Sequence, residues 1–257
     1  MIITFDQVIT FFLIFARFVG LMVYMPLLKN KNLISMGKLA LAFWSSLLVI
    51  FLIPLPEVLP NSMFAFFFAL IIDFFVGVLM GFASGVMVAA VETAGTLMDT
   101  QAGLSAASVL DPASGNQQAI LGHTMNELAT LLFLLMYGHH LVIGALFESF
   151  YLIPIASPID FSEGAKYVLS FGQDLFFIAF QIAAPIVLVV FIIDFAFGIL
   201  NRVAEQVNVF QLGFQVKPII SIVILLGIIP GFSDVLVRIL DLFSQKVNIL
   251  LSYLVQQ

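Results

Sequence analysis

Six long apolar stretches occupy most of the chain, and they constrain its fold more than any other feature. A stretch of about 20 apolar residues can cross the hydrocarbon of a bilayer as a helix. Hydrophobic residues make up 62% of the chain and charged residues 9%, so a soluble domain of 257 residues could not bury this much apolar surface. We therefore predict an all-α, polytopic membrane protein with helices near residues 8–25, 39–53, 64–91, 128–155, 175–200 and 219–229.

The uneven lengths of these stretches argue against six simple membrane crossings. The third and fourth are longer than a bilayer requires, and the sixth is interrupted by "PGFSD". Beyond Gly231, apolar residues recur at helical spacing with charged and amide residues between them. This period predicts an amphipathic last helix that packs in a protein groove or on a membrane surface through Leu236, Ile239, Leu240, Phe243, Val247, Leu250, Leu251 and Leu254.

Composition and motif content argue against several classes of function. The chain has no cysteine, which excludes disulfides and thiolate metal sites. Its net charge of -6 comes from scattered acidic residues, so nucleic-acid binding is not expected. The histidines lack metal-binding spacings such as H-x-x-x-H or HExxH, and the glycines form no phosphate-binding loop. We expect no enzyme activity, no metal ion and no cofactor.

A row of small residues marks one candidate packing surface. Gly77, Gly81 and Gly85 form G-x-x-x-G-x-x-x-G, and Ala89 and Thr93 continue the same helix face. Without side chains between them, two helices can approach to backbone contact. The partner helix could belong to this chain or to a different subunit.

Ionisable side chains inside the apolar stretches are the candidate polar sites. Each is costly in hydrocarbon and needs a partner or water. We expect Arg17 to find an acidic or carbonyl partner and Asp194 to be paired, in interhelical or intersubunit contacts. The alternative is a polytopic ion or solute transporter that uses the carboxylates within the membrane. The residues concerned are Arg17, Asp73, Glu92, Asp99, Glu127, Glu148, Asp194 and Arg238, with His123, His139 and His140 nearby.

One long stretch, residues 103–122, is small and polar in an otherwise apolar chain. Its sequence is "GLSAASVLDPASGNQQAILG". Non-helical backbone cannot face lipid, so at membrane depth it must be buried in protein or line a watery cavity. The alternative is an ordinary surface loop. The scarcity of charge, with Asp111 as the one charged residue, favours the inside of a pore.

Six motifs in order resemble the FliR family, the flagellar type III export-gate subunit related to the SctT subunit of virulence injectisomes. The resemblance covers nearly the whole chain. One departure is Glu205, where the family usually has proline. The motifs are "ARFVGLMVYMPLL", "VGVLMGFASG", "ETAGTLMDTQAGLSAASVLDPASGNQ", "YGHHLVIGALFESFYLIP", "APIVLVVFIIDFAFGILNR" and "QVNVFQLGFQVKP".

The resemblance implies a particular architecture and set of partners. A FliP-like part, residues 1–160, would be fused to a FliQ-like helical hairpin, residues 161–257, and both would form kinked hairpins around a channel. The chain would assemble with FliP, FliQ and the other membrane proteins of the export apparatus. This assembly would lie in the flagellar basal body at the bacterial inner membrane, in contact with lipid, and would export unfolded flagellar proteins. A virulence injectisome subunit is the nearest alternative.

The resemblance also implies roles for individual residues. Within the stretch 103–122, a plug would close the pore through Leu104, Ser105, Ala106, Ala107, Ser108, Val109, Leu110, Asp111, Pro112, Ala113, Ser114, Gly115, Asn116 and Gln117. Polar residues of the family motifs would be buried or make intersubunit contacts: Arg17, Glu92, Asp99, His139, Asp194, Arg202, Asn208 and Lys217.

Overall fold

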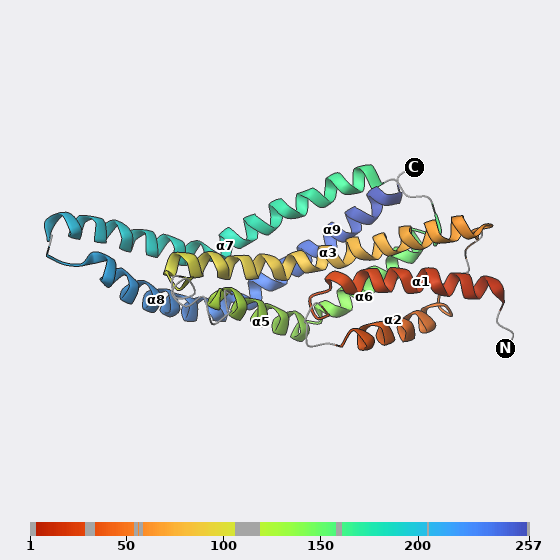
Figure 1. Ribbon diagram of the computed structural model, residues 1–257, viewed down its shortest axis with the longest axis horizontal. Coiled ribbons are helices and arrows are strands. Elements are labelled where there is room, and N and C mark those ends of the chain that lie inside the picture. Colours follow the sequence, from red (N-terminus) through yellow and green to blue (C-terminus); the bar gives the residue numbers. More distant parts are fainter. Residues whose placement is uncertain are drawn as a thin grey trace. The chain divides into compact units, whose positions relative to one another are not determined.

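Helices account for nearly all of the regular structure in the computed structural model, which describes residues 4–28, 34–53, 56, 59–105, 119–157, 161–204 and 206–255. No β-strand occurs among these residues. Figure 1 shows the helices in chain order: α1 (Phe5–Tyr24), α2 (Ser35–Val49), α3 (Met63–Ala102), α5 (Ile120–Leu135), α6 (Gly138–Leu152), α7 (Phe161–Val203), α8 (Val209–Ile228), the short 3-10 helix η2 (Ile229–Gly231) and α9 (Phe232–Val255).

The described helices confirm the prediction of an all-α polytopic membrane protein. In the most apolar windows of α3 and α7, only 28% of the residues are buried within the chain. The others must contact lipid or another protein. Segments long and apolar enough to cross a bilayer are Phe5–Tyr24, Met63–Ala102, Lys166–Val203 and Val209–Leu254, and α5 with α6 would add a fifth if they form one broken span.

The predicted single helix over residues 128–155 is wrong, because α5 and α6 are separate helices. Tyr137 lies between them with φ of 58°, a left-handed conformation that a continuous right-handed helix does not contain. Gly138, His139 and His140 follow Tyr137 directly, but α5 and α6 together are apolar enough to span a membrane, so their average hydropathy did not reveal the break. In contrast, α3 continues past residue 91, where the predicted helix ends, and reaches Ala102. The more polar residues after Val91 are therefore also helical.

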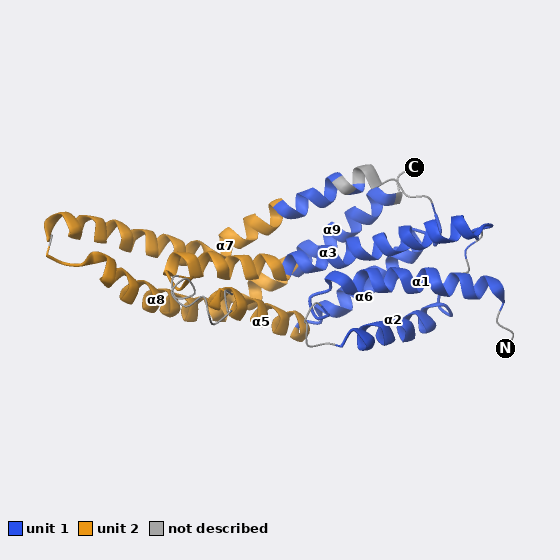
Figure 2. Ribbon diagram, in the orientation of Figure 1, with its two compact units in different colours: residues 1–87, 136–172, 240–257 blue, residues 88–135, 173–239 orange. Residues whose placement is uncertain are grey.

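Two compact units divide the described chain, and each contains residues from distant parts of the sequence (Figure 2). Unit 1 comprises residues 1–87, 136–172 and 240–257, and unit 2 comprises residues 88–135 and 173–239. Helices α3, α7 and α9 each contribute to both units. The boundary predicted at residue 160 separates a FliP-like part from a FliQ-like part. It makes no statement about compact units, so the division into two units does not test it, and it stays a prediction.

Unit 1 is held together by apolar and aromatic contacts between its helices. α1 packs beside α2, where the rings of Phe11 and Phe43 are 5.2 Å apart. The last part of α9 packs against the start of α7, where the rings of Tyr167 and Tyr253 are 5.3 Å apart. The Lys246 ammonium lies over Tyr167 at 5.6 Å, so its long side chain covers an aromatic surface.

The amphipathic period of the last helix is confirmed. All eight predicted apolar positions of α9 are buried: Leu236, Ile239, Leu240, Phe243, Val247, Leu250, Leu251 and Leu254. Charged residues of the opposite face, Arg238 and Asp241, are exposed. The apolar face of α9 therefore finds its groove within this chain.

In unit 2, close backbone contact joins α3 to α5, and a helical hairpin is formed by α7 and α8. A Cβ on Gly95 would lie 2.6 Å from the carbonyl oxygen of Leu121, and one on Gly122 would lie 2.6 Å from Thr96 Oγ1. Only glycine permits helices to approach this closely. Asn208 begins α8 as its N-cap, with Oδ1 accepting a hydrogen bond from the Gln211 amide at 3.1 Å.

Candidate functional site

The glycine row of α3 lies against α1 of the same chain. A Cβ on Gly77 would collide with the carbonyl oxygen of Arg17, and one on Gly81 with that of Leu21. At Gly85 the same atom would lie 2.8 Å from the carbonyl oxygen of Tyr24. Of the two partners left open by the sequence, the structure therefore places an intrachain helix against these glycines.

Arg17 is fully buried at this crossing and is paired with Asp73 of α3. Its Nε and Nη2 both donate to Asp73 Oδ1, the first at 2.9 Å. Its Nη1 donates to the carbonyl oxygens of Ser149 at 3.1 Å and Ile153 at 3.2 Å, at the end of α6. The Phe150 ring lies 4.4 Å from the guanidinium carbon. The expected acidic and carbonyl partners of Arg17 are thus both present in this chain.

Asp99 is buried near the end of α3 and receives two hydrogen bonds. Ser105 Oγ donates to its Oδ2 at 3.1 Å, and the backbone amide of Leu121 donates to its Oδ1 at 3.2 Å. Only 1% of Asp99 is exposed. Of the predicted plug residues, Leu104 and Ser105 are described, and both are partly buried. Residues 106–117 lie outside the described residues.

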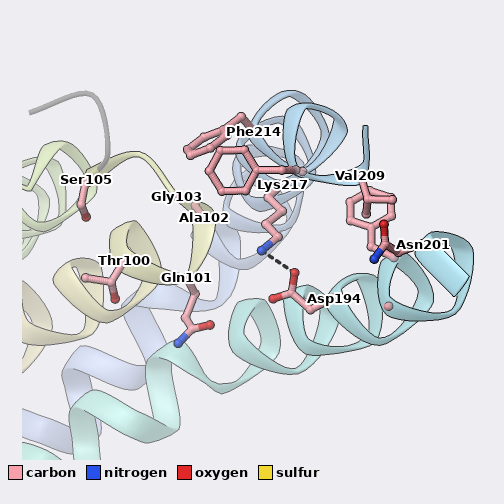
Figure 3. A pocket seen from close by; sticks show the side chains of 14 residues that line it. Thr100, Gln101, Ala102, Gly103, Ser105, Asp194, Asn201, Val209, Phe214 and Lys217 are labelled. Atoms are coloured by element: carbon pink, nitrogen blue, oxygen red, sulfur yellow. Dashed lines mark ion pairs between the residues drawn. The ribbon is translucent and has the colours of Figure 1, made fainter. Parts of the chain in front are cut away.

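A crevice of about 590 Å³ opens in unit 2 beside the end of α3. Figure 3 shows the Lys217 ammonium of α8 directed at the Asp194 carboxylate of α7, and these groups form an ion pair. The expectation that Asp194 is paired is therefore met within this chain. Polar and aromatic residues share the lining: Thr100, Gln101, Ser105, Asp194, Asn201, Lys217, Phe197, Phe210 and Phe214.

The Asp194–Lys217 pair remains accessible from outside the chain. The Asp194 side chain is 46% exposed and that of Lys217 is 23% exposed. Many large apolar side chains of the same two helices are also exposed, among them Phe191, Phe195, Phe210, Phe214 and Ile219. An exposed ion pair within an apolar surface is unfavourable in hydrocarbon, so water or polar protein groups must meet it.

The remaining predicted polar residues have different surroundings. Glu92 and His139 are partly buried, and His139 Nδ1 has no hydrogen-bond partner among the described residues. The His139 and His140 rings are 4.3 Å apart. Arg202 and Asn208 are exposed at the ends of α7 and α8, so they are not buried within this chain. Within the described parts of the chain, no group of three or more metal-ligating side chains occurs.

Sequence reasoning missed several partners at these contacts. Asp73 was recognised as an acid within an apolar stretch but was not matched to Arg17. Gly20 of α1 belongs to the first family motif, but its packing role was missed, although a Cβ there would collide with the carbonyl oxygen of Phe74. Its position three residues after Arg17 was a usable signal, because it lies on nearly the same helix face.

Comparison with known families establishes the class of the protein. Residues 8–243 match the family described as "Bacterial export proteins, family 1", and this range covers most of the chain. Together with the apolar helices, the match defines a polytopic membrane protein of a bacterial export machinery.

Individual relatives make the assignment more specific. The flagellar biosynthetic protein FliR of Bacillus subtilis is 32% identical over 246 residues, covering 93% of this chain and 92% of that protein. FliR of Escherichia coli is 30% identical over 234 residues, covering 91% and 88%. The secretion system apparatus protein SsaT of Salmonella typhimurium is 27% identical over 158 residues, covering 61% and 60%. The chain belongs to the FliR family of bacterial export proteins, as its motifs predicted.

Proposed function

We propose that this chain is the FliR-type subunit of a flagellar type III export gate, in which it forms with FliP and FliQ a channel for unfolded flagellar proteins. The observation that carries the proposal is the match to FliR proteins along nearly the whole chain. Family members are structural membrane proteins of the export apparatus, so the chain is not an enzyme. It is a protein of the bacterial inner membrane.

The flagellar system is favoured over the virulence injectisome by the extent of the matches. The flagellar relatives from Bacillus subtilis and Escherichia coli align with more than nine tenths of the chain, whereas SsaT aligns with 61% of it. The same matches favour an export subunit over the small-solute transporter that the sequence left open. Expression in a flagellar strain that lacks its own FliR should restore motility, and failure to restore it while the chain is present in the membrane would contradict the flagellar assignment.

The fusion of a FliP-like part with a FliQ-like part belongs to the same proposal. In support of it, α7 begins at Phe161, next to the predicted boundary, and forms a hairpin with α8. Large exposed apolar side chains on this hairpin would be covered by FliP, FliQ or lipid. Co-purification tests the partners. The tagged chain should recover both proteins in detergent, and recovery of the chain alone as a stable homo-oligomer would argue against them.

The stretch 104–117 is proposed to plug the closed channel. Support comes from its small, nearly uncharged sequence and from the hydrogen bonds of Ser105 and Leu121 to one carboxylate, which hold its flanks on folded helices. Small and polar side chains have little apolar surface to bury, so removal of this stretch should leave the assembly intact. A bias of about 3 kcal/mol toward the closed state would keep the channel shut more than 99% of the time.

The plug is tested by replacing residues 106–117 with a short Gly-Ser linker and measuring conductance across membranes that contain the assembled complex. We expect the variant to conduct ions without cargo, because the occluding segment is absent while the channel walls remain. Ser108→Ala should leave conductance at the level of the unmodified complex, because no single side chain makes the seal. A fully assembled deletion variant that is as tight as the unmodified complex would contradict the plug.

A further inference from the structure

The crevice of unit 2 has a charge-balanced lining. Among the described residues that line it, Asp194 of α7 and Lys217 of α8 are the only ionisable side chains, and they form an ion pair. The pair uses Asp194 Oδ1, so Oδ2 and the other ammonium protons of Lys217 can face a ligand. The crevice therefore offers one negative and one positive group, and it has no net charge of its own.

Uncharged polar side chains complete the polar part of the lining. Gln101 and Asn201 contribute amides and Thr100 contributes a hydroxyl (Figure 3). Each of these groups can donate and accept hydrogen bonds, so they suit the ester and phosphate oxygens of a ligand as well as an ammonium group. The crevice volume of about 590 Å³ is within the range of sites that bind small molecules.

Aromatic side chains border the charged pair. Phe210 and Phe214 of α8 line the crevice with their ring centres 4.7 Å apart, and both are exposed. On α7, Phe191 lies one turn before Asp194 and is also exposed. Both helices belong to segments long and apolar enough to cross a bilayer. The accessible charges thus lie beside a surface that acyl chains can cover, as the charged headgroup of a phospholipid lies beside its own chains.

We propose that this crevice binds phosphatidylethanolamine, a zwitterionic phospholipid, with the ammonium group at Asp194, the phosphate at Lys217 and the acyl chains along the exposed phenylalanines. Basic pockets between membrane helices bind anionic headgroups. An anionic headgroup in this crevice would meet the Asp194 carboxylate as well as Lys217, whereas a headgroup with both charges is attracted at both ends. A primary ammonium also donates hydrogen bonds to a carboxylate. The hydrated headgroup supplies the polar surroundings that the exposed ion pair needs.

Native mass spectrometry of the complete, delipidated chain in detergent tests the site, with lipids of identical acyl chains added one at a time. We expect dioleoylphosphatidylethanolamine to bind roughly two- to fivefold more tightly than dioleoylphosphatidylglycerol, which is the factor that one exposed charge contact contributes. Phosphoethanolamine without acyl chains should compete at least about tenfold more weakly, because burial of two methylene groups already contributes about that factor.

Substitution of Asp194 gives a sharper result than loss of binding. Asp194→Asn leaves the crevice with a net positive charge, so the preference should reverse in favour of phosphatidylglycerol. Lys217→Gln leaves a net negative charge and should weaken the binding of both lipids. Asp241→Asn is the matched control, because it makes the same change in total charge at an exposed position of α9 that does not line the crevice. The control should keep the preference of the unmodified chain.

Several outcomes would overturn the proposal. The first is equal or absent binding of the two lipids by the unmodified chain, and the second is a preference that Asp194→Asn and Asp241→Asn change alike. The same measurement on the assembled complex recovered from membranes gives the third. Lipid that binds the isolated chain but not the complex would show that another subunit fills the crevice. Restoration of motility tests the export function separately, so either proposal can fail without the other.

Discussion

Two ion pairs within helices of membrane length have opposite surroundings. Arg17 and Asp73 in unit 1 have side chains that are each 1% exposed, and two carbonyl oxygens at the end of α6 accept hydrogen bonds from Nη1 of the guanidinium. Asp194 and Lys217 in unit 2 border a crevice and remain 46% and 23% exposed. The first pair is enclosed by its own chain, although Asp73 Oδ2 has no hydrogen-bond partner among the described residues. The second pair needs water or another protein around it.

Because the two ion pairs differ in exposure, their charges have different effects on the protein. Removing one partner of a fully enclosed pair destabilises the protein, because the other charge is then buried with neither water nor an opposite charge beside it. An accessible pair stabilises its own chain little, because solvent screens it, but it can contribute to contacts with other molecules. The predictions below test whether the two pairs behave in these different ways.

The largest effect should come from removing one partner of the enclosed pair. We expect Arg17→Leu or Asp73→Leu alone to lower the free energy of unfolding by about 3–5 kcal/mol, since each leaves an uncompensated buried charge. The double variant Arg17→Leu and Asp73→Leu should recover much of this loss. Thermal unfolding of the purified protein in detergent measures all three. A double variant as unstable as the sum of the two single variants would contradict this account.

An intermediate effect should come from the glycines that bring α1 and α3 together around the same pair. Gly81→Leu places a side chain against the Leu21 backbone, and overpacking of this kind costs about 1–3 kcal/mol. Gly144→Leu is the matched control in unit 1, because a Cβ at Gly144 has no neighbour within 4 Å. Unfolding temperatures in detergent should fall for the first variant only. Equal unfolding temperatures for the two variants would show that close approach at Gly81 is not required.

The smallest effect on the isolated chain should come from the accessible pair. Asp194→Asn or Lys217→Gln should change its free energy of unfolding by no more than about 1 kcal/mol, as is typical of exposed pairs. The same substitutions should reduce recovery of the assembled complex more strongly if polar groups of another subunit meet this pair. Unfolding of the isolated chain and recovery of the complex are therefore measured side by side. A loss of several kcal/mol in the isolated chain would remove the distinction between the pairs.

The amino-acid sequence determined the class of fold and the helices whose signal is local. Length and apolar content decide that a segment needs lipid or protein around it, and the period of apolar residues decides which face of α9 is buried. Both properties are carried by residues close together in the chain. For this reason all eight predicted positions of α9 were correct, and the FliR motifs identified the family.

Tertiary structure alone decided which polar groups meet. Arg17 binds Asp73, which is 56 residues away in the sequence. It also binds the carbonyl oxygen of Ser149 at the end of α6, which is 132 residues away. Tyr137 interrupts an apolar run that hydropathy treats as continuous, and Asp99 reaches Leu121 from another helix. Each of these features depends on how the helices pack together. The spacing of apolar residues along the chain does not encode that packing. The sequence could show that buried charges need partners, but only packing could select those partners.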